Sequence, residues 1–330
     1  MMEPVQILIG LAVLVIIAIL WWQRSSAGRS RAHGLELTTD LTERARQGRL
    51  EPVVGMDVVV ERILHVIARK QKNNPLLIGE PGVGKTAAVE RLAQRIAAGD
   101  VPTSFKNKTV LQLHVTDVLS DTKYRGEMEA RLSRLIERLE SEPRKNILFI
   151  DELHMIEQAR GGEGSVDIAD ILKPALGRGL QVIGATTWQE YQTHLKPDSA
   201  VDRRFQPILV EEPSRETTVA ILRGIKGTYE SFHGVCIPDE TIDAAVDASI
   251  KLIKDRVLPD KALDLIDEAC AKVAIEGPHP PHACALGLVH AASSAVKADC
   301  PEGTPSVSIK DIEDIASQWQ RHRTRPERPA

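Results

Sequence analysis

The sequence predicts an α/β fold, in which a mostly parallel sheet is flanked by helices and followed by a smaller helical domain. From about residue 41 to residue 212, short apolar runs alternate with amphipathic helical periods, the pattern of a doubly wound sheet. After Pro213 the pattern is helical throughout. The 330 residues, 42% hydrophobic and 27% charged, suffice for more than one domain and exclude a mainly disordered or fibrous chain.

An apolar segment opens the chain. In residues 5–22 the only polar side chain is Gln6, and a helix of that length measures about 27 Å, close to the hydrocarbon thickness of a bilayer. Trp21 and Trp22 stand where interfacial anchors are expected, and arginines follow before any acidic residue. We expect residues 1–23 to be a single-pass transmembrane helix in the cell membrane, with everything after Trp22 in the cytoplasm. The alternative, a cleaved signal peptide, would need a basic start and a shorter apolar core.

Five buried strands are expected after a small, polar stretch, residues 24–40, which we interpret as a cytoplasmic tether. Between the strands, helical periods at Thr86–Ala97 and Glu127–Glu140 each carry one apolar face. Residues 41–212 therefore form the predicted large α/β domain. The expected strands are Pro75–Ile78, Thr109–Leu113, Ile147–Ile150, Gln181–Ala185 and Ile208–Val210.

Residues 213–277 form the predicted helical domain. Ser214 can cap one of its helices, and Pro259 can open another. A loop at residues 278–305 is expected next, because glycine, proline and small residues interrupt the helical pattern there. Residues 306–330 are expected to contain a terminal amphipathic helix and a basic tail.

The charge balance bears on possible partners. The chain has 42 lysines and arginines against 46 acidic residues, a net charge of −4, which argues against a nucleic-acid partner. The cysteines lie far apart without a CxxC motif, which is typical of reduced thiols in a cytosolic compartment. These cysteines are Cys236, Cys270, Cys284 and Cys300.

A phosphate-binding motif follows the first expected strand. The segment GEPGVGKT matches GxxxxGK[ST] in full and opens a helix. Its glycines let backbone N–H groups surround phosphate oxygens, Lys85 reaches the β- and γ-phosphates, and the Thr86 hydroxyl binds Mg²⁺. A glycine-rich turn that binds nothing is the alternative, which the complete motif in this context disfavours. The predicted nucleotide-binding residues of this loop are Gly79, Glu80, Pro81, Gly82, Val83, Gly84, Lys85 and Thr86.

Two carboxylates end the apolar strand at Ile147–Ile150. A parallel strand places Asp151 at the carboxyl edge of the sheet, beside the Mg²⁺ bound to Thr86. Glu152 is one residue further on and can act as the general base for a water that attacks the γ-phosphate. We therefore predict ATP and Mg²⁺ as cofactors, with Thr86 and Asp151 at the metal.

From these motifs outward, the sequence resembles the first ATPase module of the Clp-type AAA+ unfoldases (ClpA, ClpB and ClpC). The resemblance implies an AAA+ P-loop NTPase fold with a helical lid domain, ATP hydrolysis and protein substrates. It extends over about residues 35–275 and resumes weakly at residues 306–319. The segments that carry it, in order, are DLTERARQGRLEPVVGMD (40–57), NNPLLIGEPGVGKTAAVE (73–90), KYRGEME (123–129), ILFIDELH (147–154), ILKPAL (171–176), VIGATTWQEY (182–191), DRRFQPILVEEPS (202–214) and LPDKALDLIDEA (258–269).

The resemblance also implies roles for residues near the γ-phosphate. Thr187, the last residue of GATT, corresponds to a polar sensor that touches the γ-phosphate or the water. Arg203 and Arg204 correspond to arginine fingers, which would stabilise charge on the phosphoryl group of the neighbouring subunit's ATP. An arginine that acts on a neighbour requires a ring or filament of subunits, and the resemblance implies a hexameric ring.

Further positions correspond to the base site and to the lid. By resemblance, Val53 and Val54 border the adenine, and Lys261 lies in the second-sensor region of the lid. The typical chaperone of this family carries two ATPase modules and a globular N-terminal substrate domain. This chain is expected to carry one module, with a membrane span in place of the N-terminal domain.

Two loops resemble substrate-gripping elements. Lys123-Tyr124-Arg125-Gly126 matches the first pore loop of the family, in which the aromatic ring, here Tyr124, grips polypeptide of any sequence. Gly161–Ser165 resembles the second pore loop. The alternative for Tyr124 is a packing role in the turn before the helix at Glu127.

The sequence is compatible with two functions. The first is a membrane-anchored, oligomeric ATPase that remodels, unfolds or translocates protein substrates. The alternative is a nucleotide-dependent assembly switch or scaffold for a membrane partner or adaptor, without threading. Tyr124 and the second pore loop favour the first, because a pure switch has no obvious use for them.

Overall fold

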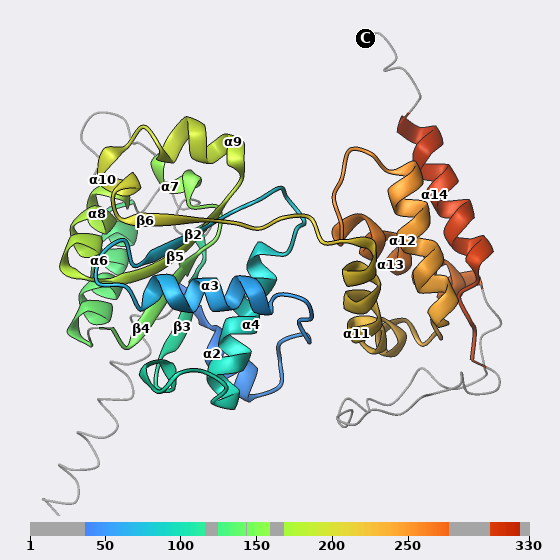
Figure 1. Ribbon diagram of the computed structural model, residues 1–330, viewed down its shortest axis with the longest axis horizontal. Helices are drawn as coiled ribbons and strands as arrows, with labels where there is room; N and C mark the ends of the chain where they lie inside the picture. Colours follow the sequence, from blue (N-terminus) through green and yellow to red (C-terminus); the bar gives the residue numbers. More distant parts are fainter. Residues whose placement is uncertain (1–36, 116–124, 143, 159–167, 277–303, 324–330) are drawn as a thin grey trace, which may run out of the picture.

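The computed structural model shows two lobes, one built around a sheet and one of helices, joined by a short linker (Figure 1). The predicted transmembrane segment, Tyr124 and the second pore loop lie outside the described residues. Within the described part of the chain, no helix has the length and apolar character needed to cross a membrane. The structure describes residues 37–115, 125–142, 144–158, 168–276 and 304–323.

The large lobe contains a six-stranded sheet in the order β1-β3-β4-β5-β2-β6. Neighbouring strands run parallel, except that β1 pairs antiparallel with β3. The mostly parallel sheet is thus as predicted. The strands are β1 (Thr38–Asp40), β2 (Asn74–Ile78), β3 (Thr109–Leu113), β4 (Asn146–Ile150), β5 (Gln181–Thr186) and β6 (Phe205–Leu209).

Two strands differ from expectation for physical reasons. β1 lies at the end of residues 24–40, which we interpreted as a tether; its three residues are too few to show an alternating pattern. β6 begins at Phe205, three residues before the expected start at Ile208. Its Gln206 and Pro207 break the apolar run, and proline is tolerated there because β6 is an edge strand.

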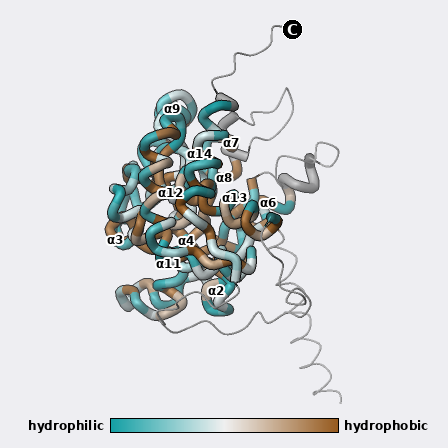
Figure 2. Tube along the Cα trace, turned by 90° about the vertical axis from the view of Figure 1, so that its right-hand side faces the viewer, coloured by the Kyte–Doolittle hydropathy of each residue, from teal (hydrophilic) through white to brown (hydrophobic). Residues whose placement is uncertain are grey.

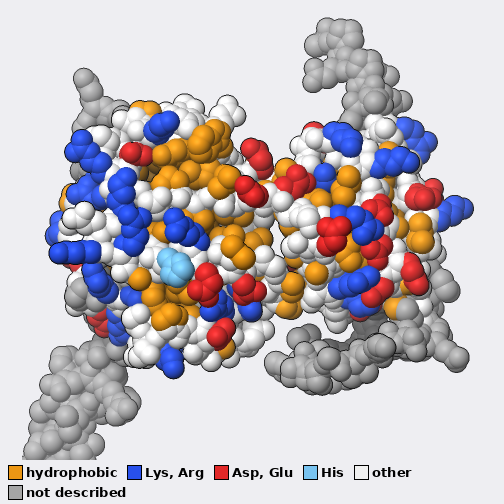
Figure 3. Space-filling model, viewed as in Figure 1, with side chains coloured by type: hydrophobic (Ala, Val, Ile, Leu, Met, Phe, Trp, Pro, Cys, Tyr) orange, Lys and Arg blue, Asp and Glu red, His pale blue; other side chains and the backbone are white. Residues whose placement is uncertain are grey.

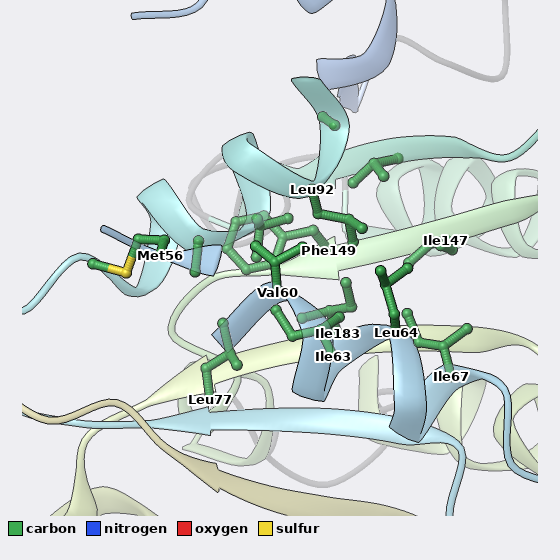
Figure 4. Close-up of a cluster of buried hydrophobic side chains, with 14 of the residues drawn as sticks. Met56, Val60, Ile63, Leu64, Ile67, Leu77, Leu92, Ile147, Phe149 and Ile183 are labelled. Carbon is green, nitrogen blue, oxygen red and sulfur yellow. The ribbon is translucent and has the colours of Figure 1, made fainter. Parts of the chain in front are cut away.

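Helices cover both faces of the sheet, as the alternating pattern predicts. Side chains of α2, α3 and α4 pack with Ile147 and Phe149 of β4 on one face; Figure 4 shows those of α3 together with Leu92 of α4. Side chains of α6, α7 and α8 pack with Leu148 and Ile150 on the other face. The helices of this lobe are α2 (Leu41–Arg46), α3 (Asp57–Ile67), α4 (Lys85–Ala98), α6 (Arg125–Ser141), α7 (His154–Gln158), α8 (Ile168–Arg178), α9 (Trp188–Glu190) and α10 (Ser199–Asp202), with the short 3₁₀ helix η1 (Thr103–Phe105) and the π-helix η2 (Tyr191–Leu195).

The second lobe is a helical lid with its own apolar core. Ser214 caps α11, because its side chain accepts a hydrogen bond from the Thr217 backbone N–H. The terminal helix α14 packs into the lid core through Ile312 and Ile315, while hydrophilic residues dominate its outer turns (Figure 2). The lid helices are α11 (Arg215–His233), α12 (Asp239–Leu252), α13 (Asp260–Glu276) and α14 (Ile309–Arg323).

The cysteines depart from the expectation of four reduced thiols. Cys270 is free and buried in the lid core, and burial raises the pKa of its thiol to about 12. Cys236, however, takes part in a disulfide. Cys284 and Cys300 lie outside the described residues. The assumption of a fully reduced chain was therefore wrong for Cys236 in this structure.

Candidate nucleotide-binding site

A cavity of about 530 Å³ lies where the two lobes meet. Figure 3 shows acidic side chains on both sides of this junction. Loops that follow β2, β4 and β5 form one wall of the cavity, and α11 and α13 of the lid contribute another. Of the predicted site residues, those that line the cavity are Val53, Val54, Pro81, Gly82, Gly84, Lys85, Thr86, Asp151, Glu152 and Thr187.

The remaining residues of the phosphate loop have other surroundings. Val83 is buried in the core of the large lobe. A Cβ atom on Gly79 would come within 2.5 Å of the Val210 carbonyl oxygen, so only glycine fits where the chain leaves β2. Glu80 lines a second cavity, of about 420 Å³, together with Thr187 and Glu190.

The phosphate loop is shaped by glycines that no other residue could replace without strain. Gly82 and Gly84 have φ angles of 85° and 94°, in the left-handed region that favours glycine. A Cβ atom at Gly82 would lie 2.6 Å from Cβ of Asp260, and one at Gly84 would lie 2.5 Å from the Met56 methyl. The loop can therefore form a cradle lined by backbone N–H groups, which bind phosphate oxygens.

Lys85 begins α4 and reaches back across the loop. Its ammonium donates hydrogen bonds to the carbonyl oxygens of Gly79, at 2.8 Å, and Glu80, at 3.0 Å. Burial lowers the pKa of Lys85, and the negative charges of Asp151 and Glu190 offset part of that effect. The Lys85 side chain therefore lines the cavity, and its hydrogen bonds within the described part of the chain go to backbone oxygens that a phosphate can replace.

The metal pair predicted from sequence is in contact. The Thr86 hydroxyl, in the first turn of α4, donates a 2.6 Å hydrogen bond to Oδ2 of Asp151 at the end of β4. A hydroxyl and a carboxylate oxygen are ligands that Mg²⁺ accepts, usually completed by water and substrate phosphates. These residues therefore fit the predicted metal.

The backbone changes direction at Glu152, shortly after the end of β4. Its φ angle is 52°, which is strained for a residue with a side chain, and its backbone N–H donates to Oδ1 of Asp151 at 3.0 Å. The turn holds the two consecutive carboxylates in different positions while both line the cavity. This arrangement suits a metal ligand followed by a general base.

Thr187 stands at the end of β5 and forms the N-cap of α9 in a capping box with Glu190. Its hydroxyl donates to Oε2 of Glu190 at 2.8 Å. Burial raises the pKa of Glu190, but hydrogen bonds from Thr187 and Thr186 and the charge of His154 bring it below its usual value. Sequence reasoning missed Glu190, although the pattern Thr-x-x-Glu is the signal of a capping box and was readable.

The base side of the cavity is apolar. Val53 and Val54 meet Ile221, Ile225 and Leu263 of the lid there. Val54 packs so closely on α11 that a Cβ atom at Gly224 would lie 2.6 Å from it. This wall matches the chemistry predicted for an adenine.

Lys261 is not brought into the cavity. The side chain is buried, its ammonium donates to the Ile253 carbonyl oxygen at 3.3 Å, and it lies 3.7 Å from the Glu212 carboxylate. The neighbouring Asp260 lines the cavity instead and touches Gly82. Lys261 therefore lies beside Glu212 and does not line the cavity, and its second-sensor role stays a prediction of the resemblance.

The arginine pair also lies apart from the cavity of its own chain. Arg203 is exposed and Arg204 half-buried, in the turn between α10 and β6. Arg125 and Gly126 occupy the first turn of α6, next to Tyr124, which is outside the described residues.

These observations define a P-loop ATPase: a phosphate cradle and a metal pair at the carboxyl edge of a parallel sheet, closed by a helical lid. Two family models match this chain. Residues 75–210 match the ATPase family associated with various cellular activities (AAA), and residues 214–300 match the AAA lid domain. The chain carries an AAA+ ATPase module of the Clp and Hsp104 type, with ATP and Mg²⁺ as its cofactors.

Individual relatives are similar over most of the chain. The chaperone ClpB of Rhodopirellula baltica is 52% identical over 72% of this chain and 27% of its own length. ClpC, the ATP-binding subunit of the Clp protease of Staphylococcus aureus, is 51% identical over 74% of this chain and 30% of its own length. The chain thus spans less than a third of these relatives.

Solved structures agree with the fold. The closed state of Hsp104 with ATPγS and FITC casein superposes with a TM-score of 0.73, at 39% identity over 87% of this chain and 45% of that chain. The extended complex of S. cerevisiae Hsp104 with casein gives a TM-score of 0.66, at 45% identity over 73% of this chain and 41% of that chain.

The first prediction concerns the general base. Glu152→Gln is expected to bind ATP normally and to lower the hydrolysis rate roughly 100-fold or more, the usual contribution of a positioned base. Lys85→Ala should instead weaken ATP binding itself. Phosphate release and binding of a fluorescent ATP analogue measure the two effects. Glu240→Gln, on the exposed start of α12, is the control. Hydrolysis by Glu152→Gln at the wild-type rate would contradict the assignment.

The second prediction concerns the shape of the phosphate loop. Gly82→Ala should weaken nucleotide binding at least about tenfold, because the methyl group would both strain a left-handed backbone and collide with Asp260. Gly99→Ala is a matched control: its φ is 75°, with no atom within 4 Å of the added Cβ, so it should cost about 1 kcal/mol of stability and no affinity. Equal affinity losses in the two variants would show that strain alone, and not the loop, is responsible.

Proposed function

We propose that the protein is a membrane-anchored, oligomeric ATPase that uses ATP hydrolysis to remodel, unfold or translocate protein substrates. One observation carries the proposal: the phosphate loop, the Thr86–Asp151 pair and Glu152 line one cavity in a module that is 52% identical to a chaperone ClpB and 51% identical to a Clp protease ATP-binding subunit. Hsp104, whose fold the chain shares, has been solved with casein, which supports polypeptide as the class of substrate.

The residues of the site divide the work of hydrolysis. The backbone of the phosphate loop and the Lys85 ammonium bind and orient the phosphates. Thr86 and Asp151 would hold Mg²⁺, which supplies positive charge to the phosphate oxygens when bound. Glu152 takes a proton from the attacking water, and Thr187 helps to orient the reacting groups.

Assembly follows from a shortage of positive charge. Among the described residues that line the cavity, Lys85 is the single lysine or arginine. A loose phosphoryl-transfer transition state is typically stabilised by a further cation, and exposed Arg203 can supply it to a neighbouring subunit. We therefore propose that the protein self-associates into a ring. The resemblance to the Clp-type family implies that this ring is a hexamer.

The membrane and pore parts of the proposal rest on sequence. Residues 5–22 support an anchor in the cell membrane with the ATPase domain in the cytoplasm, and such an anchor allows a membrane partner or adaptor. Tyr124, with Arg125 and Gly126, supports a loop that grips polypeptide in a central pore. The net charge of −4 supports the absence of a nucleic-acid partner.

Threading is tested by separating ATP hydrolysis from work on protein. Tyr124→Ala should leave basal ATP hydrolysis largely intact and abolish unfolding of a tagged fluorescent reporter, because the ring would contact polypeptide and not nucleotide. The full chain in proteoliposomes is compared with Tyr124→Ala and with Tyr229→Phe, which changes a partly buried lid tyrosine. If Tyr124→Ala unfolds the reporter as well as wild type, threading is excluded and the assembly switch or scaffold is the better description.

The anchor is tested by extraction and topology. The full chain should stay in the membrane pellet after carbonate treatment, whereas a chain that begins at residue 24 should be released. In spheroplasts, external protease should leave the ATPase domain intact, since arginines after the span keep it in the cytoplasm. Release of the full chain by carbonate, or digestion of the ATPase domain from outside, would contradict the proposed topology.

A further inference from the structure

One oxygen atom beside the nucleotide cavity is unusually well supplied with donors. Oε2 of Glu190 accepts from the Thr187 hydroxyl at 2.8 Å, the Thr187 backbone N–H at 3.1 Å and the Thr186 hydroxyl at 3.3 Å. Nδ1 of His154 lies 3.1 Å from the same oxygen. Glu190 lines both the 530 Å³ nucleotide cavity and the adjoining 420 Å³ cavity, so this cluster borders the space in which ATP would react.

The hydrogen bonds fix the direction in which Thr187 can act. An ionised carboxylate only accepts hydrogen bonds, so the single hydroxyl proton of Thr187 must be donated to Glu190. The Thr187 oxygen also accepts the Glu190 backbone N–H, at 3.3 Å. A hydroxyl oxygen has two acceptor positions, and one therefore remains for a partner in the cavity.

We propose that Glu190 is a positioning residue for ATP hydrolysis. By taking the hydroxyl proton of Thr187, Glu190 makes Thr187 an acceptor toward the cavity. Thr187 then receives a hydrogen bond from the attacking water and does not donate one to a phosphate oxygen. This inference rests on the proposed function, because it presupposes that the module hydrolyses ATP.

The carboxylate is held in this position from the catalytic segment itself. His154, which is buried, follows Glu152 by two residues and also lies 3.2 Å from the Thr186 hydroxyl. Between them, the Leu153 backbone N–H donates to the Ala185 carbonyl oxygen at 2.9 Å. Glu152 and Thr187 are therefore tied into one hydrogen-bonded unit, in which the proposed base and the proposed acceptor for the same water keep a fixed relation.

A purely structural explanation makes a different prediction. Glu190 also completes the capping box of α9, a role worth about 1 kcal/mol of stability. Loss of a cap lowers the melting temperature and the folded fraction, but it leaves kcat per folded molecule unchanged. The two roles are therefore distinguished by kcat and by coupling to Thr187, not by stability.

The experiment uses the full chain in proteoliposomes and measures kcat, KM for ATP, affinity for a fluorescent ATP analogue and melting temperature. Glu190→Leu, which removes the acceptor, should lower kcat roughly 10- to 100-fold, the scale of a misoriented reacting group, with little change in KM. Glu190→Gln keeps an acceptor oxygen and should restore most of the rate. Gln189→Leu is the matched control, since its exposed side chain lines the second cavity outside the network.

Coupling to Thr187 is the decisive measurement. Thr187→Val should lower kcat to a similar degree, Thr187→Ser should retain it, and the double variant Thr187→Val/Glu190→Leu should be no slower than Thr187→Val alone. If Glu190→Leu keeps wild-type kcat, or if the two losses multiply in the double variant, the proposal is overturned. Glu190→Ala replaces Glu190→Leu if the latter does not fold.

Failure of this inference and failure of the proposed function are separable. Glu152→Gln, assayed beside the Glu190 variants, reports whether the module hydrolyses ATP at this site. An inactive Glu152→Gln with a fully active Glu190→Leu rejects the positioning role alone. Wild-type hydrolysis by both variants rejects the site on which the role depends.

Discussion

The carboxyl ends of three adjacent parallel strands, β4, β5 and β2, fix the site. In the register of these strands, Ile78 pairs with Thr186 and Ile150 pairs with Gly184, so all three chains leave the sheet at one edge. All residues of β2 and β5 are buried, so a shift of register would disturb close packing against the helices on both faces of the sheet. Core packing therefore sets the position of the site loops before any ligand binds.

The hydrogen bond between Thr86 and Asp151 depends on this register. At 2.6 Å it joins α4, which follows β2, to the end of β4, although β5 lies between the two strands. Gly184 makes that crossing possible, because a Cβ atom there would lie 2.7 Å from the Leu153 side chain. A small residue in the middle strand thus lets the segment after β4 lean across β5 toward the phosphate loop.

The sequence alone predicted the phosphate side of the site, since GEPGVGKT and the Asp151-Glu152 pair follow buried strands directly. It did not predict which lid residue faces the loop. Lys261 and Asp260 are adjacent, and only the packing of α13, with Lys261 against Glu212, decides which one turns inward. Glu190 was missed for a different reason: α9 has three residues and shows no periodicity, so the Thr-x-x-Glu pattern of a capping box was its one signal. β1 was not predicted either, because its three residues are too few to show an alternating pattern.

The electrostatics of the cavity link the ATP site to assembly. Acidic side chains from both lobes line it, and Lys85 is the single lysine or arginine among the described lining residues. Burial raises the pKa of Glu90 and of Asp260, and a neighbouring carboxylate adds to the effect at each, Glu51 at Glu90 and Asp264 at Asp260. The acidic lining residues are Glu51, Glu90, Asp151, Glu152, Glu190 and Asp260.

A polyphosphate can be held in such a cavity only with added positive charge. Mg²⁺ at Thr86 and Asp151 offsets part of the repulsion, and an arginine from a neighbouring subunit would offset more as charge builds up in the transition state. Arg203 and Arg204 do not line the cavity of their own chain, so in the proposed ring they would supply this charge to a neighbouring subunit. In the ring that we propose, the same acidic lining would make hydrolysis depend on the assembled state.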